Sequence, residues 1–162
     1  MRIGVVSDTH DRMPNVERIV NLFNQIRVDR VIHTGDLTQP AVLEALAQLD
    51  APVYGVFGNN DIPDHARLAA DATRLGLNFG LPPRTLDWAG RRILVLHDPE
   101  DTLDVSPDPV DLILHGHTHR HRHEQIGNTL IFNPGECAGF LKGRNAVGVI
   151  DLISLKAERV LF

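Results

Sequence analysis

The clearest chemical signal in this sequence is the stretch of residues 112–119, which reads Leu-Ile-Leu-His-Gly-His-Thr-His. An apolar run of the kind that forms a buried strand ends here in closely spaced imidazoles, and histidine is the commonest metal ligand. Gly116 permits a sharp turn without a side chain in the way, and the spacing of His117 and His119 lets both rings point into one pocket. The stretch therefore predicts metal ligands at the end of a strand.

Four earlier apolar runs also end in oxygen or nitrogen ligands. The residues that follow these runs are Asp8 and His10, Asp36, Asn59, and His97. Together with His117 and His119 they offer carboxylate, amide and imidazole donors without a thiolate, which suits Mn²⁺, Fe²⁺, Zn²⁺ or Ni²⁺ better than a closed structural zinc site. Seven donors exceed the needs of one tetrahedral ion, so a bridging carboxylate would divide them between two ions. Paired ions about 3.5–4 Å apart are the usual clamp for phosphoryl transfer, and a hydroxide that bridges them is a nucleophile at neutral pH.

Each candidate ligand also has a simpler interpretation. A lone Asp after a strand, such as Asp8 or Asp36, is most often a turn residue or a helix cap. Asn59 could be a plain turn residue, and His97 a buried histidine with satisfied hydrogen bonds. Because candidates follow five different apolar runs, we favour the metal interpretation for all of them. Asp61 is the exception, and we interpret it as the cap of a following helix.

Several other reactive residue types receive supporting or structural interpretations. His33 lies inside a predicted strand and is expected to pack or to hydrogen-bond behind a ligand, and His115 is a second candidate for that role. Arg12 is the arginine best placed by sequence to bind a phosphate oxygen. The single cysteine, Cys137, is expected to be a packing residue, because nothing around it indicates a nucleophile.

Composition sets the outer limits of these interpretations. With 162 residues and 43% hydrophobic content, residues 1–162 are predicted to form a single globular domain. One cysteine excludes an internal disulfide framework, no apolar run approaches the roughly 20 residues of a membrane span, and the first residues lack a signal peptide. We therefore expect a cytoplasmic protein without a membrane partner. A net charge of −5 and the lack of a basic block argue against long nucleic acid as a partner, although bound cations can still make a pocket locally positive.

The first sixty residues alternate strand and helix patterns. We predict strands at 2–7 and 30–33, a third strand from Pro52, and helices at 15–27 and 40–49, each helix with one apolar face. This order implies parallel strands with right-handed crossovers. Ligands of such sheets lie outside the carboxyl ends of the strands.

The pattern of strands and helices changes in the second half of the sequence. A helix is predicted at 63–75 and a surface loop at 99–109. Hairpin signals are typical of antiparallel or mixed pairing; the predicted strand pairs are 84–88 with 91–97, 121–126 with 129–132, and 147–153 with 155–162. The pattern indicates two packed sheets with helices outside. The last residues, 160–162, could form an exposed edge, so self-association into a homo-oligomer is an open alternative.

The motifs, taken in order, resemble those of one known family. Asp8-x-His10, Gly35-Asp36, Gly58-Asn59-x-Asp61, His97 and Gly116-His117-x-His119 are similar to the motifs of the calcineurin-like metallophosphoesterase superfamily, and the length is similar to that of its small prokaryotic phosphodiesterase branch. With Asn133-Pro134-Gly135 and the terminal strands, the resemblance covers nearly the whole chain. It implies an α/β fold, a four-layer αββα sandwich with two mixed sheets flanked by helices, around a dinuclear centre.

The resemblance also implies roles for individual residues. One ion would be held by Asp8, His10 and His119, the other by Asn59, His97 and His117, with Asp36 as the bridge. Asp36 and Asn59 are the expected catalytic residues, because the first would hold both ions and the second would steady the charge of the phosphate. Many larger members have His between the Asn and Asp of the third motif, and this sequence has Asn60 there. The group that assists the leaving group is therefore unassigned.

We accordingly expect a dimetal-dependent phosphoesterase that hydrolyses a small phosphoester by attack of a metal-bridging hydroxide. Mn²⁺ is the first choice for the two divalent ions, with Fe²⁺, Ni²⁺ or Zn²⁺ as alternatives. Asp11, Asp98 and Glu136 stand where glycine or serine is frequent in the family, and an acidic rim would repel a doubly charged monoester more than a singly charged diester. A phosphodiesterase is therefore favoured. The alternatives are a phosphomonoesterase or nuclease with the same centre, or a non-catalytic protein-binding scaffold like the superfamily's retromer subunit.

Overall fold

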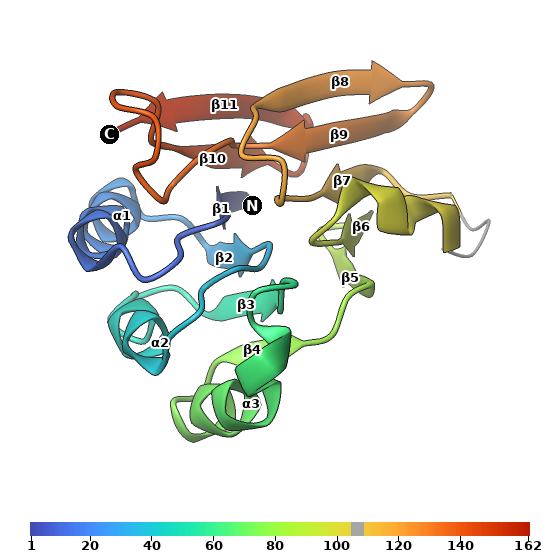
Figure 1. The fold of residues 1–162 in the computed structure, drawn as a ribbon. Helices are drawn as coiled ribbons and strands as arrows, with labels where there is room; N and C mark the ends of the chain where they lie inside the picture. The colour runs from blue at the N-terminus through green and yellow to red at the C-terminus, as the bar shows by residue number, and fades with distance from the viewer. Residues whose placement is uncertain (105–108) are drawn as a thin grey trace.

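The structure is a computed structural model that describes the backbone of residues 1–104 and 109–162 and the side chains of 1–101 and 109–162. Within these residues, two mixed β-sheets pack face to face (Figure 1). The six-stranded sheet has the order β11 (Lys156–Leu161), β10 (Ala146–Asp151), β1 (Arg2–Val6), β2 (Arg30–His33), β3 (Val53–Val56) and β4 (Asn78–Gly80). The five-stranded sheet has the order β5 (Arg84–Trp88), β6 (Arg91–Val95), β7 (Leu112–Leu114), β9 (Thr129–Asn133) and β8 (Arg122–Ile126).

Three α-helices pack on the outer face of the six-stranded sheet. They are α1 (Met13–Ile26), α2 (Pro40–Leu46) and α3 (His65–Arg74), the last preceded by the 3₁₀ helix η1 (Ile62–Asp64). A proline in the first turn of α1 and of α2 fits their starts, because the first helical N–H groups lack intrahelical partners. The predicted helix 40–49 is three residues too long, since the chain leaves α2 in short turns from Gln48 to Ala45 and from Leu49 to Leu46.

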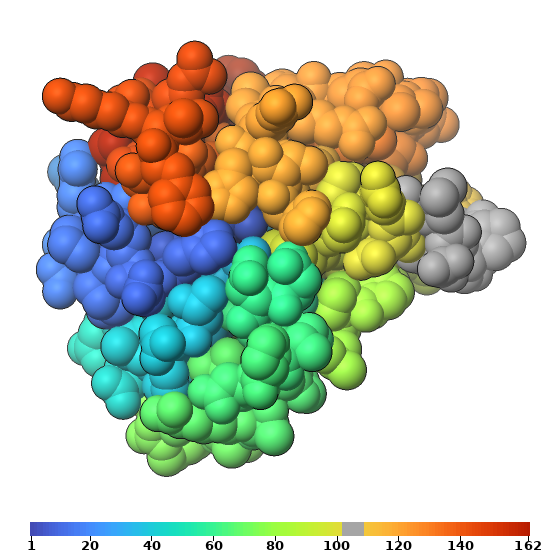
Figure 2. Space-filling view, in the orientation of Figure 1, coloured from blue at the N-terminus to red at the C-terminus, as the bar shows by residue number. Residues whose placement is uncertain are grey.

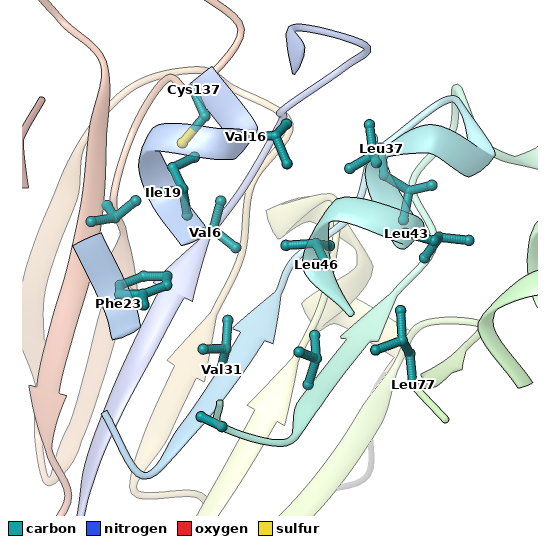
Figure 3. Packing of buried hydrophobic residues seen from close by; sticks show 14 of the residues in the cluster. Val6, Val16, Ile19, Phe23, Val31, Leu37, Leu43, Leu46, Leu77 and Cys137 are labelled. Carbon is teal, nitrogen blue, oxygen red and sulfur yellow. The ribbon is translucent and has the colours of Figure 1, made fainter. Parts of the chain in front are cut away.

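The helices and the sheet share one apolar core (Figure 3). In α1, Ile19 and Phe23 point at the sheet, as the helical spacing of the apolar residues predicts. In α2, Leu43 and Leu46 do the same beside Val31 of β2. All five side chains are at most 1% exposed, so this layer is held by close apolar packing.

A second core lies between the sheets. Alternate residues of the strands enter it, including Ile3 and Val5 of β1, Val95 of β6 and Phe132 of β9. Both faces of the central strands are therefore apolar, which explains the uninterrupted apolar runs in the sequence.

The pairing of strands agrees with the sequence pattern. β1, β2 and β3 are parallel, as are β6, β7 and β9, whereas the hairpins β5–β6 and β8–β9 and the pair β10–β11 are antiparallel. The fold prediction of two mixed sheets with helices is confirmed. The three α-helices cover the six-stranded sheet, and η2 (Pro99–Asp104) is a 3₁₀ helix on the side of the other sheet. It replaces part of the predicted loop 99–109, of which residues 105–108 lie outside the described residues.

One strand was not predicted. β4 has three residues and pairs in parallel with β3 through Tyr54–Asn78, Gly55–Phe79 and Val56–Gly80. Three residues are too few to show a period of two, so the pattern carried no signal for it. Among the described residues, no helix is long and apolar enough to cross a membrane.

Candidate metal centre

The loops that follow β1 and β2 are bound to each other before any ligand is considered. The backbone N–H of Asp8 donates to the carbonyl of Gly35 at 3.1 Å, and that of His10 donates to the carbonyl of Asp36 at 2.9 Å. Thr34 N–H in turn donates to the carbonyl of Val6 at 2.9 Å. These bonds extend the parallel pairing past the strand ends, so Asp8 and Asp36 are placed side by side.

All seven predicted ligand residues meet at this place. Ligand atoms of Asp8, His10 and His119 lie within 4.8 Å of one another, and so do those of Asp8, Asp36 and His97. Strand ends of both sheets contribute residues, because β1 and β2 belong to one sheet and β6 and β7 to the other. Segments from the beginning, the middle and the last third of the chain lie side by side on one face of the molecule (Figure 2).

Asp36 lies between two groups of imidazoles. Its Oδ1 is 3.4 Å from Nε2 of His97, and its Oδ2 is 3.9 Å from Nε2 of His10. On the second side, His10 Nε2 is 3.4 Å from His119 Nε2, which is itself 3.7 Å from Asp8 Oδ1. Asp8 is the residue common to the two sets of side chains whose ligand atoms lie within 4.8 Å of one another.

Asn59 completes the group on the His97 side. Its Oδ1 is 2.9 Å from His97 Nε2 and 3.0 Å from His117 Nδ1. One amide oxygen thus faces two ring nitrogens at the exposed mouth of the centre. The other nitrogen of His117, Nε2, lies 3.4 Å from a carboxylate oxygen of Asp98, an arrangement that fixes the ring orientation of metal-binding histidines.

The orientation of His97 is fixed from behind. Its Nδ1 is 2.9 Å from the carbonyl oxygen of Thr34, which can only accept, so Nδ1 carries the proton and donates it. In the neutral ring, Nε2 then presents its lone pair toward Asp36 and Asn59. This is the tautomer that a metal ligand requires.

Five of the seven predicted ligand residues have a left-handed backbone. The φ angles are 49° for Asp8, 43° for His10, 58° for Asp36, 64° for His117 and 55° for His119. Positive φ is uncommon for residues other than glycine and costs about 1–2 kcal/mol per residue. Such a concentration at one place indicates strain maintained at a functional site.

Two glycines make the close approach of these loops feasible. A Cβ at Gly58 would collide with Oδ1 of Asp36, and a Cβ at Gly116 would collide with Oγ of Ser7. Any side chain at these positions would displace Asp36 or Ser7. The glycines of the third and fifth motifs are therefore required for packing around the centre.

Asp36 and His97 are both buried, and each shifts the pKa of the other. Burial by itself would raise the pKa of Asp36, but the hydrogen bond and the charge of His97 in its protonated form, with two hydrogen bonds from Asn60, lower that pKa well below its usual range. Burial would lower the pKa of His97, and the hydrogen bond and charge of Asp36 raise it instead. Asp36 is therefore ionised at neutral pH and available to a cation.

Asp8 is in a different environment. Burial raises the pKa of its carboxyl, against the lowering effects of the Ser7 hydroxyl and of His119. Both of its oxygens also accept the backbone N–H of His117 at 3.1 Å. A buried carboxylate without a full counter-charge favours a bound cation.

Asp61 does not cap a helix, contrary to the prediction from the sequence. No side-chain cap bond is made at η1; instead the buried carboxylate accepts backbone N–H groups of Gly58 at 2.7 Å, Asp36 at 2.9 Å and Thr38 at 2.7 Å. Burial raises its pKa against these hydrogen bonds. Asp61 therefore ties the loop after β2 to the loop after β3 and holds both Asp36 and Asn59 in place.

His33 has the supporting role that was predicted for it. Its Nδ1 accepts the N–H of Gly35 at 3.1 Å, so its Nε2 carries the proton and donates to Thr9 Oγ1 at 3.0 Å. Burial lowers the pKa of His33 to about 3, so the ring stays neutral. The side chain joins the loop after β1 to the loop after β2.

The structure also shows the contacts of the other supporting residues. Asn133 donates from Nδ2 to the carbonyl of Gly116 at 3.0 Å and lies 3.4 Å from His115 Nδ1, and burial lowers the pKa of His115. Asn60 donates to both oxygens of Asp36, at 2.9 Å from the backbone and 2.7 Å from the side chain. The position before Asp61 in the third motif was the only sequence signal for Asn60.

One of the three acids expected at the rim lies elsewhere. Glu136 is 1% exposed, and its Oε1 accepts the N–H of Leu141 at 2.7 Å, so it is a buried loop residue and no part of an acidic rim. Asp98 is at the mouth but faces His117, as described above. Asp11 is exposed, as expected. The rim is thus less acidic than the sequence predicted.

The donor set fits divalent transition-metal ions. The centre brings imidazole nitrogens together with carboxylate and amide oxygens. Each neutral His has one ring nitrogen that can bind a cation. A thiolate has no part, because Cys137 is buried, its Sγ donates to the carbonyl of Ala146 at 3.0 Å, and burial raises its pKa to about 12. The interpretation of Cys137 as a packing residue is confirmed.

Comparison with known proteins places this arrangement in a family. Residues 1–154 match the model of the calcineurin-like phosphoesterase superfamily domain. The chain belongs to this superfamily. The resemblance inferred from the motifs is therefore confirmed.

Individual relatives are small phosphodiesterases. Phosphodiesterase MJ0936 of Methanocaldococcus jannaschii is 28% identical, with 93% of each chain covered. Phosphodiesterase YfcE of Escherichia coli is 27% identical, over 93% of this chain and 88% of YfcE. The solved structure of an archaeal phosphodiesterase superposes with a TM-score of 0.90 at 27% identity, over 100% of both chains.

Proposed function

We propose that this protein is a dinuclear, metal-dependent phosphodiesterase. The observation that carries the proposal is the position of Asp36, whose two carboxylate oxygens face imidazoles of two separate groups, His97 on one side and His10 on the other. A carboxylate in that position can join two cations. Paired cations bind and activate both the attacking and the leaving oxygen of a phosphoester.

The ligand sets follow from the two groups. One ion would be held by Asp8, His10 and His119 and the other by Asn59, His97 and His117, and Asp36 would bridge them. The distances among these side chains support this division. Mn²⁺ is the foremost choice for both sites, since oxygen donors outweigh soft donors, and Fe²⁺, Ni²⁺ and Zn²⁺ satisfy the same ligands.

The chemistry divides between the ions and the chain. When bound, the ions supply an activated water and neutralise phosphate charge. Asp36 would hold both ions, and its own position depends on the side chain of Asn60 and on the hydrogen bond from its backbone N–H to Asp61. Asn59, exposed at the mouth, orients its amide oxygen inward and leaves its amide nitrogen to donate to an oxygen of the substrate phosphate.

Asn60 explains how the site works without the histidine found there in larger members. Its amide donates to Asp36 at 2.7 Å and so is occupied in holding the bridge. Position 60 therefore has a structural task and provides no proton for the leaving group. Substrates with stable leaving groups are expected to react best.

A diester is the favoured substrate class. The mouth of the centre carries the carboxylates of Asp98 and Asp11, and a singly charged diester is repelled less than a doubly charged monoester. The names of the relatives, phosphodiesterases MJ0936 and YfcE, support the same choice. A small phosphoester, and no long nucleic acid, is the expected partner, because the net charge of −5 disfavours a polyanion.

Two further expectations belong to the proposal. We infer a cytoplasmic location from the single, buried cysteine, which fits a reducing compartment. Self-association is proposed only through β11, which lies at the edge of its sheet and can pair with a second copy.

The test is hydrolysis of bis-p-nitrophenyl phosphate by chelator-treated protein, with and without added Mn²⁺. Strong turnover that depends on Mn²⁺, is lost in Asp36→Ala and exceeds turnover of p-nitrophenyl phosphate is the expected result. Asp50→Ala is the matched control, because Asp50 is an exposed carboxylate away from the centre. Equal turnover in the Asp36 variant, or no turnover with Mn²⁺, Fe²⁺, Ni²⁺ and Zn²⁺, contradicts the proposal, and the latter result favours the protein-binding scaffold.

A further inference from the structure

An aromatic side chain lies at the edge of the candidate metal centre and has no role in the centre as described so far. Phe140 is 68% exposed, although its ring centroid is 5.4 Å from that of His119, with the planes nearly parallel at 19°. It lies equally close to His10, at 5.4 Å and 51°. Both histidines belong to the same predicted metal site, so Phe140 flanks one ion and not the other.

A pocket opens beside this ring. It has a volume of about 270 Å³ and is lined by His10, Arg12, Thr38 and Phe140, among others. His10 is therefore shared by the pocket and the metal centre. An ester group of a phosphate held at the centre would therefore lie within reach of this pocket, which Phe140 and Arg12 both line.

The loop that carries Phe140 is fixed by buried polar groups. Glu136 Oε1 accepts the N–H of Leu141 at 2.7 Å, and Asn15 Nδ2 donates to the carbonyl of Cys137 at 2.7 Å. Glu136 is 1% and Asn15 8% exposed. The second bond ties the loop to α1, directly behind Arg12. The ring is thus held in place by the fold while most of its surface faces water.

We propose, on the basis of the proposed phosphodiesterase function, that Phe140 and Arg12 form a specificity pocket for a planar aromatic group esterified to the substrate phosphate. An aromatic group stacks on the face of a phenyl ring and beneath a planar guanidinium, so both side chains contribute to the same interaction. The volume of about 270 Å³ accommodates one ring system. The substrate class is an aryl or nucleobase-bearing phosphodiester.

The position of the pocket distinguishes this occupant from a second protein molecule. Phe140 lies against two predicted ligands, so a protein surface that covered the ring would close the entrance to His10 and His119. An ester group on the bound phosphate covers the ring and leaves the reacting atoms in place. Leu141, the next residue, is 50% exposed but takes no part in lining the pocket, which makes it a matched control.

Binding is measured by calorimetry on the Mn²⁺-loaded protein with two inert, singly charged probes. Diphenylphosphinate and dimethylphosphinate share the anionic group and differ only in their aryl or methyl substituents. We expect the aryl probe to bind roughly three- to tenfold more tightly. Phe140→Leu, which keeps an apolar side chain but removes the ring, should abolish this ratio, Phe140→Tyr should retain it, and Leu141→Ala should leave it unchanged.

Turnover gives a second measurement. Phenyl p-nitrophenyl phosphate and methyl p-nitrophenyl phosphate release the same leaving group, so their KM values differ through the retained ester group alone. Phe140→Leu should raise KM for the phenyl ester by roughly three- to tenfold with kcat unchanged, and should leave the methyl ester unaffected. Circular dichroism confirms that each variant is folded.

The binding ratio decides the inference whether or not the protein hydrolyses these esters. Equal affinity of the wild-type protein for both probes overturns it, as does an aryl preference that persists in Phe140→Leu. A dimer that dissociates in Phe140→Leu, with no change in the ratio, also overturns it and assigns the ring to a contact between copies. Failure of the proposed function is a separate result, namely that neither ester is hydrolysed with any of the four metals.

Discussion

His97 and Asp36 face each other across the junction of the two sheets, with Nε2 of the histidine 3.4 Å from Oδ1 of the aspartate. His97 lies just beyond β6 of the five-stranded sheet, and Asp36 lies beyond β2 of the six-stranded sheet. The imidazole is further bound to the Thr34 carbonyl, also beyond β2. The candidate centre is therefore built at the contact between the sheets, and its ligands depend on how the sheets pack.

Asn59→Ala is expected to reduce Mn²⁺-dependent turnover of bis-p-nitrophenyl phosphate by about 10²–10³-fold. The variant removes both the amide oxygen that faces His97 and His117 and the amide nitrogen available to the phosphate. Because Asn59 is exposed, the melting temperature of the metal-free protein should change little. Steady-state kinetics and a thermal melt check the two halves of this prediction, and near wild-type kcat would exclude Asn59 from the centre.

Asp61→Asn is expected to lower stability by about 1–3 kcal/mol and Mn²⁺ affinity by about 10–100-fold. An amide oxygen replaces only one of two oxygens that together accept three backbone N–H groups, and the new NH₂ group then meets a donor. Urea denaturation and a Mn²⁺ titration measure the two effects. Asp64→Asn, on the exposed surface nearby, is the control, and equal behaviour of both variants would show that Asp61 supports nothing at the centre.

His117→Gly is expected to separate stability from metal binding. The histidine has a φ of 64° and a side chain that is 41% exposed, so glycine relieves a strained backbone and removes little packing. The greater freedom of glycine in the unfolded chain offsets part of the gain. The metal-free variant should therefore melt at or slightly above the wild-type temperature, whereas the rise in melting temperature that Mn²⁺ produces in the wild type should be lost. A melt well below wild type would contradict the strain argument.

The pH dependence of stability should contain a measurable contribution from His33. Its pKa is about 3 in the folded protein and near 6.5 when unfolded, so below pH 6.5 the unfolded chain binds a proton that the folded chain refuses. This contribution to stability is complete above pH 6.5 and is lost as the pH falls toward 3, by about 2 kcal/mol between pH 7 and 5. Urea denaturation of metal-free protein at several pH values measures it. His33→Gln should show a shallower loss over the same interval, and an identical slope would count against a neutral, buried imidazole.

Most of the fold could be predicted because its signals are local. The apolar faces of α1 and α2 show the helical period, the hairpin at Ala89-Gly90 has turn residues between two strand patterns, and the buried strands are uninterrupted apolar runs. What failed were short features. The three residues of β4 and the 3₁₀ turns after α2 are too short for a period to develop, so they are decided by packing against neighbours.

The convergence of the seven candidate residues could be predicted because each follows a strand end, and strand ends meet at one edge of a sheet. The structural roles of Asp61 and Glu136 could not be predicted. A single Asp before a helix has the same sequence signature whether its carboxylate caps that helix or reaches a distant loop, as it does to Thr38. The burial of Glu136 depends on β10 and the loop before it, because the N–H of Ala146 donates a hydrogen bond to the carbonyl of Glu136. No local sequence pattern indicates that contact.

The left-handed backbone at Asp8, His10, Asp36, His117 and His119 also bears on how such a protein changes through evolution. Glycine or asparagine at these positions relaxes the backbone, so a single substitution that removes a proposed metal ligand does not by itself carry the chain toward unfolding. Selection for catalysis alone then maintains these residues. Once that selection ends, a lineage can drift to a folded, metal-free protein through ordinary point mutations, and the two-sheet framework remains available for a different use.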